Sequence, residues 1–239
     1  MSLETLKNII TTEGFLNEPY TDDHVYVVML RDSVRMKIVS RTKWDITLRG
    51  AVDADVDLRS GVVVDGSFCY PDWGRELRIE GYVVKYGEHI FGHSFSQNGA
   101  FLVYAGAAGG YGFGMGNTPR HYRGCRVDYG IGGLVPMILD GQDCLNAWYV
   151  ENNEVQGRCI VGHDTTARRI VIIVQDEDRS EYNLDQLREF AKALGCTEVV
   201  VLDGGASAML KHRGTWRVRN SLIKDFCNPN AVGFYSRGA

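Results

Sequence analysis

Two apolar runs in the second half of the chain, residues 169–175 and 199–202, predict buried strands because valine and isoleucine dominate both. Between them, apolar residues at helical spacing predict a helix over 184–194, with Asn183 as its N-cap and Gly195 as its end. A strand, a helix and a strand in this order predict a βαβ unit, whose two strands run parallel. The pattern therefore favours an α/β (α+β) fold with a mixed sheet. The apolar stripe of the helix consists of Leu184, Leu187, Phe190, Ala191 and Leu194.

The first 59 residues form a separate part of the prediction. Residues 3–12 have the apolar spacing of a short amphipathic helix, and 25–29 and 35–39 predict two strands that are candidates for one hairpin. We expect residues 1–59 to be an accessory N-terminal segment, as added sheet or as a docking element. Residues 60–239 are expected to form the main domain, since no internal repeat or low-complexity linker divides them.

The composition of the chain indicates which kinds of partner and which location to expect. The chain has 239 residues, 44% of them hydrophobic, and a net charge of −4, so no basic surface indicates a nucleic-acid partner. No apolar run is long enough to span a membrane, and the N-terminus lacks the pattern of a signal peptide. Six scattered cysteines without a Cys-x-x-Cys motif predict reduced thiols and a cytoplasmic protein. No spacing of histidine, cysteine and acidic residues predicts a metal site, and we expect no cofactor.

The run at 199–202 ends in the clearest candidate site, Asp203-Gly204-Gly205-Ala206-Ser207. Glycine lacks a side chain and adopts positive φ, so a bulky group can approach the backbone there. In open α/β sheets, ligands bind beyond the carboxyl ends of the strands. The alternative is a tight turn with a solvated aspartate, which is common in proteins.

Two further stretches have candidate chemistry. Residues 105–116 contain six glycines and predict a long loop, either over a site or on the surface, although a phosphate cradle is an alternative. Residues 119–126 include Arg120, Arg123 and Arg126, whose guanidinium groups suit a phosphate. A solvated, charged loop is an equally good interpretation of that cluster.

Residues 202–207 resemble the Leu-Asp-Gly-Gly-Gly-Ser signature of the phosphodiester glycosidase domain family. Other segments resemble family motifs in the family's order, so the resemblance extends from about Gly61 to Phe234. Asp65-Gly66-Ser67-Phe68 is similar to its Asn-Gly-Gly-Phe motif, and Arg158-Cys159-Ile160-Val161-Gly162 to its Arg-Thr-Ala-Ile-Gly motif. The remaining similar segments are 131–136, with Gly132 and Gly133, and 218–221 and 230–234, with Asn220 and Asn230.

The resemblance implies a hydrolase that cleaves the glycosidic bond of a sugar-1-phosphodiester, such as an N-acetylglucosamine-1-phosphodiester. Its partner would be a small sugar phosphodiester or a glycoconjugate. Asp203 would be the acid/base or the nucleophile, Asp65 a second carboxylate, and Arg158 a phosphate ligand. Backbone N–H groups of Gly204, Gly205 and Ser207 would hold the phosphate with Arg158. The substrate-binding set implied by the motifs is Gly204, Gly205, Ser207, Ser67, Gly132, Gly133, Asn220 and Asn230.

Three departures from the family pattern keep other functions open: Asp65 replaces asparagine, and Ser67 and Ala206 replace glycine. A carboxylate at position 65 would repel an anionic substrate unless it is protonated or paired. The chain could thus be a carbohydrate- or nucleotide-binding module that has lost activity, or a virion-associated structural protein attached through residues 1–59. For Arg158, the alternative to binding phosphate is an ion pair on the protein surface. The oligomeric state is not indicated.

Overall fold

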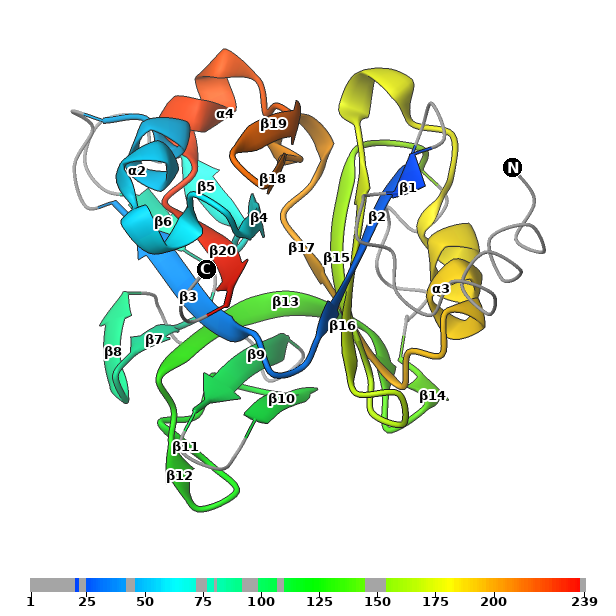
Figure 1. Ribbon diagram of the computed structural model, residues 1–239. Helices are drawn as coiled ribbons and strands as arrows, with labels where there is room; N and C mark the ends of the chain where they lie inside the picture. The colour runs from blue at the N-terminus through cyan, green and yellow to red at the C-terminus, as the bar shows by residue number, and fades with distance from the viewer. Residues whose placement is uncertain are drawn as a thin grey trace.

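The computed structural model describes residues 20–21, 25–41, 46–71, 77–79, 81–91, 99–106, 110–144 and 154–236. The expected helix over 3–12 lies outside these residues. Strands dominate the described part of the chain and only a few short helices accompany them (Figure 1). None of the described helices has the length and apolarity needed to cross a membrane.

The larger of two main sheets has eleven strands, whose central order is β1-β2-β16-β15-β17-β13-β7-β8. Strand β9 pairs with both β10 and β13, and β14 pairs with β13. The strands are β1 (Tyr20–Thr21), β2 (Val25–Arg31), β7 (Val83–Lys85), β8 (Glu88–Phe91), β9 (Ala100–Ala105), β10 (Gly110–Met115), β13 (Tyr129–Leu139), β14 (Gln142–Asp143), β15 (Arg158–Asp164), β16 (Arg169–Gln175) and β17 (Glu198–Leu202).

The smaller main sheet has five strands in the order β19-β18-β4-β20-β3. They are β3 (Arg35–Ser40), β4 (Val62–Asp65), β18 (Leu210–His212), β19 (Thr215–Val218) and β20 (Asn230–Tyr235). Two separate two-stranded pieces are formed by β5 (Cys69–Pro71) with β6 (Leu77–Ile79) and by β11 (His121–Tyr122) with β12 (Cys125–Arg126). The helices are α2 (Leu48–Ala54), α3 (Leu184–Ala193) and α4 (Leu222–Cys227), with short 3-10 turns at Val56–Leu58, Glu177–Arg179 and Gly205–Ser207.

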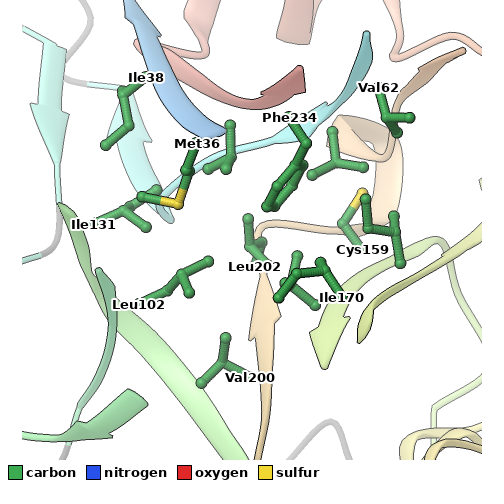
Figure 2. Packing of buried hydrophobic residues seen from close by; sticks show 14 of the residues in the cluster. Met36, Ile38, Val62, Leu102, Ile131, Cys159, Ile170, Val200, Leu202 and Phe234 are labelled. Atoms are coloured by element: carbon green, nitrogen blue, oxygen red, sulfur yellow. The ribbon is translucent and has the colours of Figure 1, made fainter. Parts of the chain in front are cut away.

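The two main sheets pack face to face, and a helix covers the outer face of each. Successive residues of a strand point to opposite faces, so Cys159 and Val161 enter the core between the sheets while Ile160 packs under α3. In the smaller sheet, Val63 packs with α2 on the outer face while Val62 faces inward. The result is a four-layer arrangement whose central core is apolar (Figure 2). Its labelled members are Met36, Ile38, Val62, Leu102, Ile131, Cys159, Ile170, Val200, Leu202 and Phe234.

The predicted strands and helix at 169–202 are present as β16, α3 and β17, but the expected βαβ unit needs correction. Strand β15 lies between β16 and β17 and is antiparallel to both. The two strands therefore run in the same direction without forming a parallel ladder, and every strand pair among the described residues is antiparallel. The cause is the tight β15–β16 hairpin, whose first strand occupies the central position.

The two strands predicted in the first 59 residues do not form a hairpin with each other. Strand β2 lies between β1 and β16 in the larger sheet, whereas β3 is an edge strand of the smaller sheet and pairs with β20. The chain thus crosses from one sheet to the other between Arg31 and Arg35. Both strands are fully integrated into the sheets, while the predicted domain division after residue 59 stays a prediction.

The glycine-rich stretch was expected to be a loop, but residues 110–115 form strand β10, antiparallel to β9. Its alternate aromatic residues explain the difference. Tyr111 is buried in the core between the sheets, with its ring centroid 5.1 Å from that of Tyr104, and Phe113 packs beside it. Burial of these side chains outweighs the low strand propensity of the intervening glycines.

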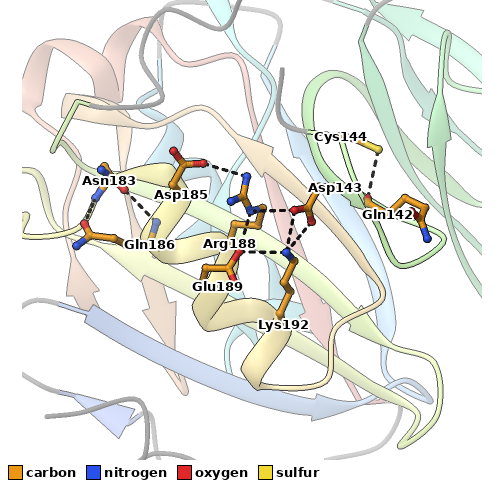
Figure 3. A network of polar contacts seen from close by, with 9 residues as sticks. All are labelled: Gln142, Asp143, Cys144, Asn183, Asp185, Gln186, Arg188, Glu189 and Lys192. Carbon is orange, nitrogen blue, oxygen red and sulfur yellow. Dashed lines mark hydrogen bonds and ion pairs between the residues drawn. The ribbon is translucent and has the colours of Figure 1, made fainter. Parts of the chain in front are cut away.

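Helix α3 begins after the predicted N-cap, Asn183, which forms a capping box with Gln186. The Asn183 side chain accepts from the backbone N–H of Gln186 at 2.9 Å, and the Gln186 side chain accepts from that of Asn183 at 2.9 Å (Figure 3). On its exposed face, Lys192 donates to Asp143 of β14 at 2.8 Å. These contacts fix the helix that covers the outer face of β15, β16 and β17.

We expect Asn183→Ala to lower the free energy of unfolding by about 1 kcal/mol, because it leaves the Gln186 amide without its cap. Chemical denaturation measures this loss: the midpoint should move to lower denaturant concentration, while the slope of the free energy of unfolding against denaturant concentration stays unchanged. Lys192→Ala is the control, since it removes an exposed ion pair on the same helix that contributes only a few tenths of a kcal/mol. Equal losses in both variants would contradict the assigned role of the cap.

Candidate functional site

The candidate site lies where β4 of the smaller sheet and β17 of the larger sheet end. The backbone N–H of Asp203, directly after β17, donates to the carbonyl of Gly66, directly after β4, at 3.0 Å. Position 66 requires glycine, because a Cβ there would fall 1.8 Å from the Asn230 side-chain oxygen. The structure therefore brings Asp65 and Asp203 together, although 137 residues lie between them in the sequence.

The Asp65 carboxyl group is almost completely buried, at 1% exposure. Its Oδ1 accepts from the backbone N–H of Gly66 at 2.8 Å, and its Oδ2 accepts from Nδ2 of Asn228 at 2.8 Å. Burial raises the pKa of Asp65 well above its usual value, and the nearby charge of Asp203 raises it further. The two hydrogen bonds and the charge of Lys224 act in the opposite direction without cancelling the increase. Asp65 thus retains its proton to a higher pH than an ordinary aspartate.

Asp203 is 8% exposed, and its Oδ1 accepts from the backbone N–H of Gly204 at 2.9 Å. Two carboxyl groups that share a buried site do not ionise independently, because the charge of the first opposes the ionisation of the second. Burial and the charge of Asp203 raise the pKa of Asp65, so Asp65 is the candidate acid of the pair. A buried pair that shares one proton combines an acid with a carboxylate, which is the combination used in general acid–base chemistry.

The neighbouring strands place further predicted residues beside Asp203. Cys159 on β15 lies opposite Leu202, so continuing this register brings Arg158 opposite Asp203. On the other side, Val135 of β13 lies opposite Val201, and the same continuation brings Gly133 next to Asp203. Arg158 is 2% exposed and its Nη2 donates to the Glu154 carbonyl at 3.5 Å. The surface ion pair considered for Arg158 does not fit its burial.

The predicted phosphate-binding role of three backbone amides does not agree with this geometry. The Gly204 N–H donates to the Asp203 side chain, the Gly205 N–H to the Gly157 carbonyl at 2.7 Å, and the Ser207 N–H to the Gly204 carbonyl at 3.0 Å. All three donors are thus used within the protein. Gly204 serves a packing role, because a Cβ there would lie 2.6 Å from the Gly157 carbonyl oxygen. Ser207 is buried and its hydroxyl contacts Oδ1 of Asn228 at 3.4 Å.

Other predicted residues carry buried polar atoms that have no hydrogen-bond partner among the described residues. They are Oγ of Ser67, both side-chain polar atoms of Asn220 and Nδ2 of Asn230. Asn230 belongs to the site, since its Oδ1 accepts from the backbone N–H of Ser67 at 3.0 Å. Asn220 precedes Ser221, whose N–H donates to the carbonyl of Ala206 at 2.9 Å. Buried polar groups are rarely left unpaired, so these atoms are candidates to bind a ligand.

Asn228 is a site residue that the sequence analysis missed. It follows α4 and donates to the Asp65 carboxyl group, but it occupies no position in the motifs that carry the family resemblance. Its distance of 163 residues from Asp65 leaves no local spacing signal. The pairing of β20 with β4, in which Ala231 lies opposite Asp65, brings Asn228, two residues before β20, into contact with Asp65.

The described residues include no group of three or more histidine, cysteine, aspartate and glutamate side chains arranged to hold a metal ion. The buried thiol of Cys159 lies near the carboxyl pair, and burial followed by the charge of Asp65 raises its pKa, which makes it a poor nucleophile. A cavity of about 520 Å³ lies at the opposite end of β4, where Gly61, His212 and Arg213 form part of its wall. None of the predicted site residues lines that cavity.

The fold and site define a class of protein. Asp65 of the smaller sheet and Asp203 of the larger sheet lie close together. The Asp203-Gly204-Gly205 turn and the buried Arg158 lie beside them. The sequence matches the model of the phosphodiester glycosidase family over residues 59–235, and the chain belongs to that family. No sequence among the curated proteins matches the chain.

Solved structures agree on the fold. The catalytic domain of zebrafish N-acetylglucosamine-1-phosphodiester alpha-N-acetylglucosaminidase, auto-inhibited by its pro-peptide, is 14% identical with a TM-score of 0.64, covering 90% of this chain and 89% of that one. A hypothetical protein from Synechocystis is 13% identical with a TM-score of 0.56, over 92% and 61% of the two chains. A Burkholderia pseudomallei K96243 protein described as exported is 10% identical with a TM-score of 0.57, over 89% and 74%.

Proposed function

We propose that the protein is a hydrolase that cleaves the glycosidic bond of a sugar-1-phosphodiester, with an N-acetylglucosamine-1-phosphodiester as the model substrate. The observation that carries the proposal is the buried Asp65–Asp203 pair, in which the pKa of Asp65 is raised by burial and by the charge of Asp203. Glycoside hydrolysis uses two carboxyl groups, one of which must hold a proton at the working pH. Membership in the phosphodiester glycosidase family supports this reaction class.

The roles of the two carboxyl groups follow from their environments. Asp65 donates its proton to the oxygen that links the sugar to phosphorus, so that the phosphate leaves as a monoester of its second alcohol. The Asp203 carboxylate acts at the anomeric carbon, either as the nucleophile or as the base that activates water. Water supplies the new anomeric hydroxyl group. If Asp203 is the nucleophile, Asp65 takes the proton of this water; if Asp203 is the base, Asp203 takes it, and exchange with solvent then restores both groups.

Different residues of the site would bind the phosphate and the sugar of the substrate. Arg158, opposite Asp203 in the strand register, is the residue expected to meet the phosphate, because a guanidinium group can bond two phosphate oxygens at once. Ser67, Asn220 and Asn230 supply buried polar atoms that suit sugar hydroxyl groups. Protonation of Asp65 also removes the repulsion that a second carboxylate would exert on an anionic substrate.

Arg158→Lys is expected to lower kcat/KM by about ten- to a hundredfold, since lysine keeps the charge but cannot form two parallel bonds to the phosphate. The melting temperature should change little, because lysine keeps most of the aliphatic stem. Kinetics and thermal unfolding measured on the same variant separate the two roles. A lowered melting temperature with unchanged kcat/KM would assign Arg158 to structure alone.

The same site could belong to a carbohydrate- or nucleotide-binding module without activity. The observation that favours this second candidate is that the amides of Gly204, Gly205 and Ser207 donate within the protein and offer the phosphate no anion-binding turn. Turnover of a sugar-1-phosphodiester, with binding measured in parallel by calorimetry, separates the candidates. Binding without turnover would establish the module.

A cytoplasmic location and a role in a virion stay predictions.

A further inference from the structure

Asn228 contacts the Asp65 carboxyl group from the C-terminal end of α4, where the backbone needs support from outside the helix. The last carbonyl groups of a helix have no partner within it and are satisfied by side chains, by water or by a capping turn. Helix α4 is only six residues long and is followed by Pro229, which has no N–H. The Asn228 N–H donates to the Lys224 carbonyl at 2.7 Å, whereas the Asn228 carbonyl needs a donor from outside the helix.

Arg41, which follows β3, provides that support. Its side chain is 4% exposed and donates from Nε to the Asn228 carbonyl at 2.8 Å, from Nη2 to the Phe226 carbonyl, and from Nη1 to the Ile46 carbonyl at 2.8 Å. Its backbone N–H donates to the Pro229 carbonyl at 2.9 Å. One buried guanidinium group thus holds the carbonyls on both sides of Cys227. Arg41 lies before residue 59, where the match to the family model begins.

We propose that Arg41 is a positioning residue that acts through Asn228 to hold the Asp65 carboxyl group in the site. The two links are the bond from Arg41 Nε to the Asn228 carbonyl, 2.8 Å, and the bond from Asn228 Nδ2 to Asp65 Oδ2, 2.8 Å. The Ser207 hydroxyl meets the other end of the Asn228 carboxamide and so limits its rotation. Part of the segment outside the family match therefore completes the site, and the kinetic consequence of this inference rests on the proposed function.

Other groups also face Asp65, and the test must separate Asn228 from them. The charged neighbours are Asp203 at the end of β17 and Lys224 on α4, and the Cys159 thiol of β15 lies close by. The Gly66 N–H bond is local to Asp65 and should persist in any variant of Arg41 or Asn228. Because Asn228 donates to the ionised form of Asp65, its loss is expected to raise the upper apparent pKa of the carboxyl pair still further.

The experiment is a double-mutant cycle on Asn228→Ala, Arg41→Lys and the combined variant. Titration of the Asp65 side-chain carboxyl ¹³C signal, assigned by its absence in Asp65→Asn, gives a readout that needs no substrate. Each single variant should shift the titration to higher pH and lower kcat about tenfold with little change in KM. Lysine keeps the charge of Arg41 but cannot reach three carbonyls at once. The combined variant should then behave as Asn228→Ala alone.

Lys37→Met is the matched control. Lys37 lies on β3, four residues before Arg41, and forms ion pairs with Asp55 and Asp57 rather than with the α4 segment. It should lower stability without moving the Asp65 titration. An Arg41→Lys variant that only loses stability, with an unmoved titration, would overturn the proposal, as would additive shifts in the combined variant. If the titration shifts as expected while the wild type shows no turnover, the positioning role stands and the proposed function fails.

Discussion

Asp203→Asn is expected to reduce kcat by about 10²- to 10⁴-fold. Asparagine matches the shape of aspartate but supplies neither a nucleophile nor a base at the anomeric carbon. The fold should persist, because the side-chain oxygen can still accept from the Gly204 N–H. Removing the charge of Asp203 also removes one cause of the raised pKa of Asp65, so the pKa of Asp65 should decrease.

Steady-state kinetics and the Asp65 carboxyl titration, measured on the same preparation, check both parts of this expectation. Asp178→Asn is the control, because Asp178 is exposed on the 3-10 turn after β16. A variant that keeps more than a tenth of wild-type kcat would exclude Asp203 from the chemical step. Lost activity with an unchanged Asp65 titration would instead show that the two carboxyl groups are not coupled.

Asp65→Asn is expected to abolish the acid step and, at the same time, to remove a decrease in the stability of the protein as pH rises. The pKa of Asp65 is raised in the folded state, so between the unfolded and the folded pKa the native protein binds more protons than the unfolded chain. In that window the stability of the wild type decreases as pH rises, by about 1.4 kcal/mol for each pH unit. Asparagine has no proton to lose, and the variant should lack this decrease.

Denaturant unfolding at a series of pH values, from below the ordinary carboxyl pKa to well above it, measures the difference between the two proteins. Asparagine has a single side-chain oxygen, so it can accept from the Gly66 N–H or from Nδ2 of Asn228 but not from both. The lost hydrogen bond lowers the stability of the variant at every pH, and the comparison therefore rests on the slope of stability against pH. Parallel stability curves for the wild type and Asp65→Asn would mean that the pKa of Asp65 is not raised. A variant with wild-type kcat would remove Asp65 from the mechanism.

Local patterns in the sequence were sufficient to predict the elements around the site. The valine run before Asp203 is buried strand β17, and the apolar stripe after Asn183 is the buried face of α3. Side chains alternate along a strand, which accounts for Cys159 and Val161 lying between the sheets while Ile160 packs under α3. The segments that carry the family motifs meet in space, since Asp65, Asp203 and Asn230 lie together, while the roles assigned to these residues stay predictions.

The order of strands could not be read from the same patterns. The hairpin that places β15 between β16 and β17 is decided by long-range pairing, and an apolar run does not specify its neighbours. Strand β10 was missed because its glycines outweigh the signal of Tyr111 and Phe113. Asn228 and Arg41 were missed for a related reason: their roles depend on contacts between residues 163 and 187 positions apart.

The central claim, hydrolysis at the sugar side of a phosphodiester by the Asp65–Asp203 pair, is tested most directly in water enriched in ¹⁸O. The substrate is the methyl diester of N-acetylglucosamine 1-phosphate, with the wild type and Asp203→Asn compared. The account predicts that the wild type places the label on the anomeric hydroxyl of the released sugar, leaves methyl phosphate unlabelled, and loses this turnover in Asp203→Asn. Label in the phosphate would show cleavage of the phosphorus–oxygen bond and would contradict the account, as would equal turnover by both proteins.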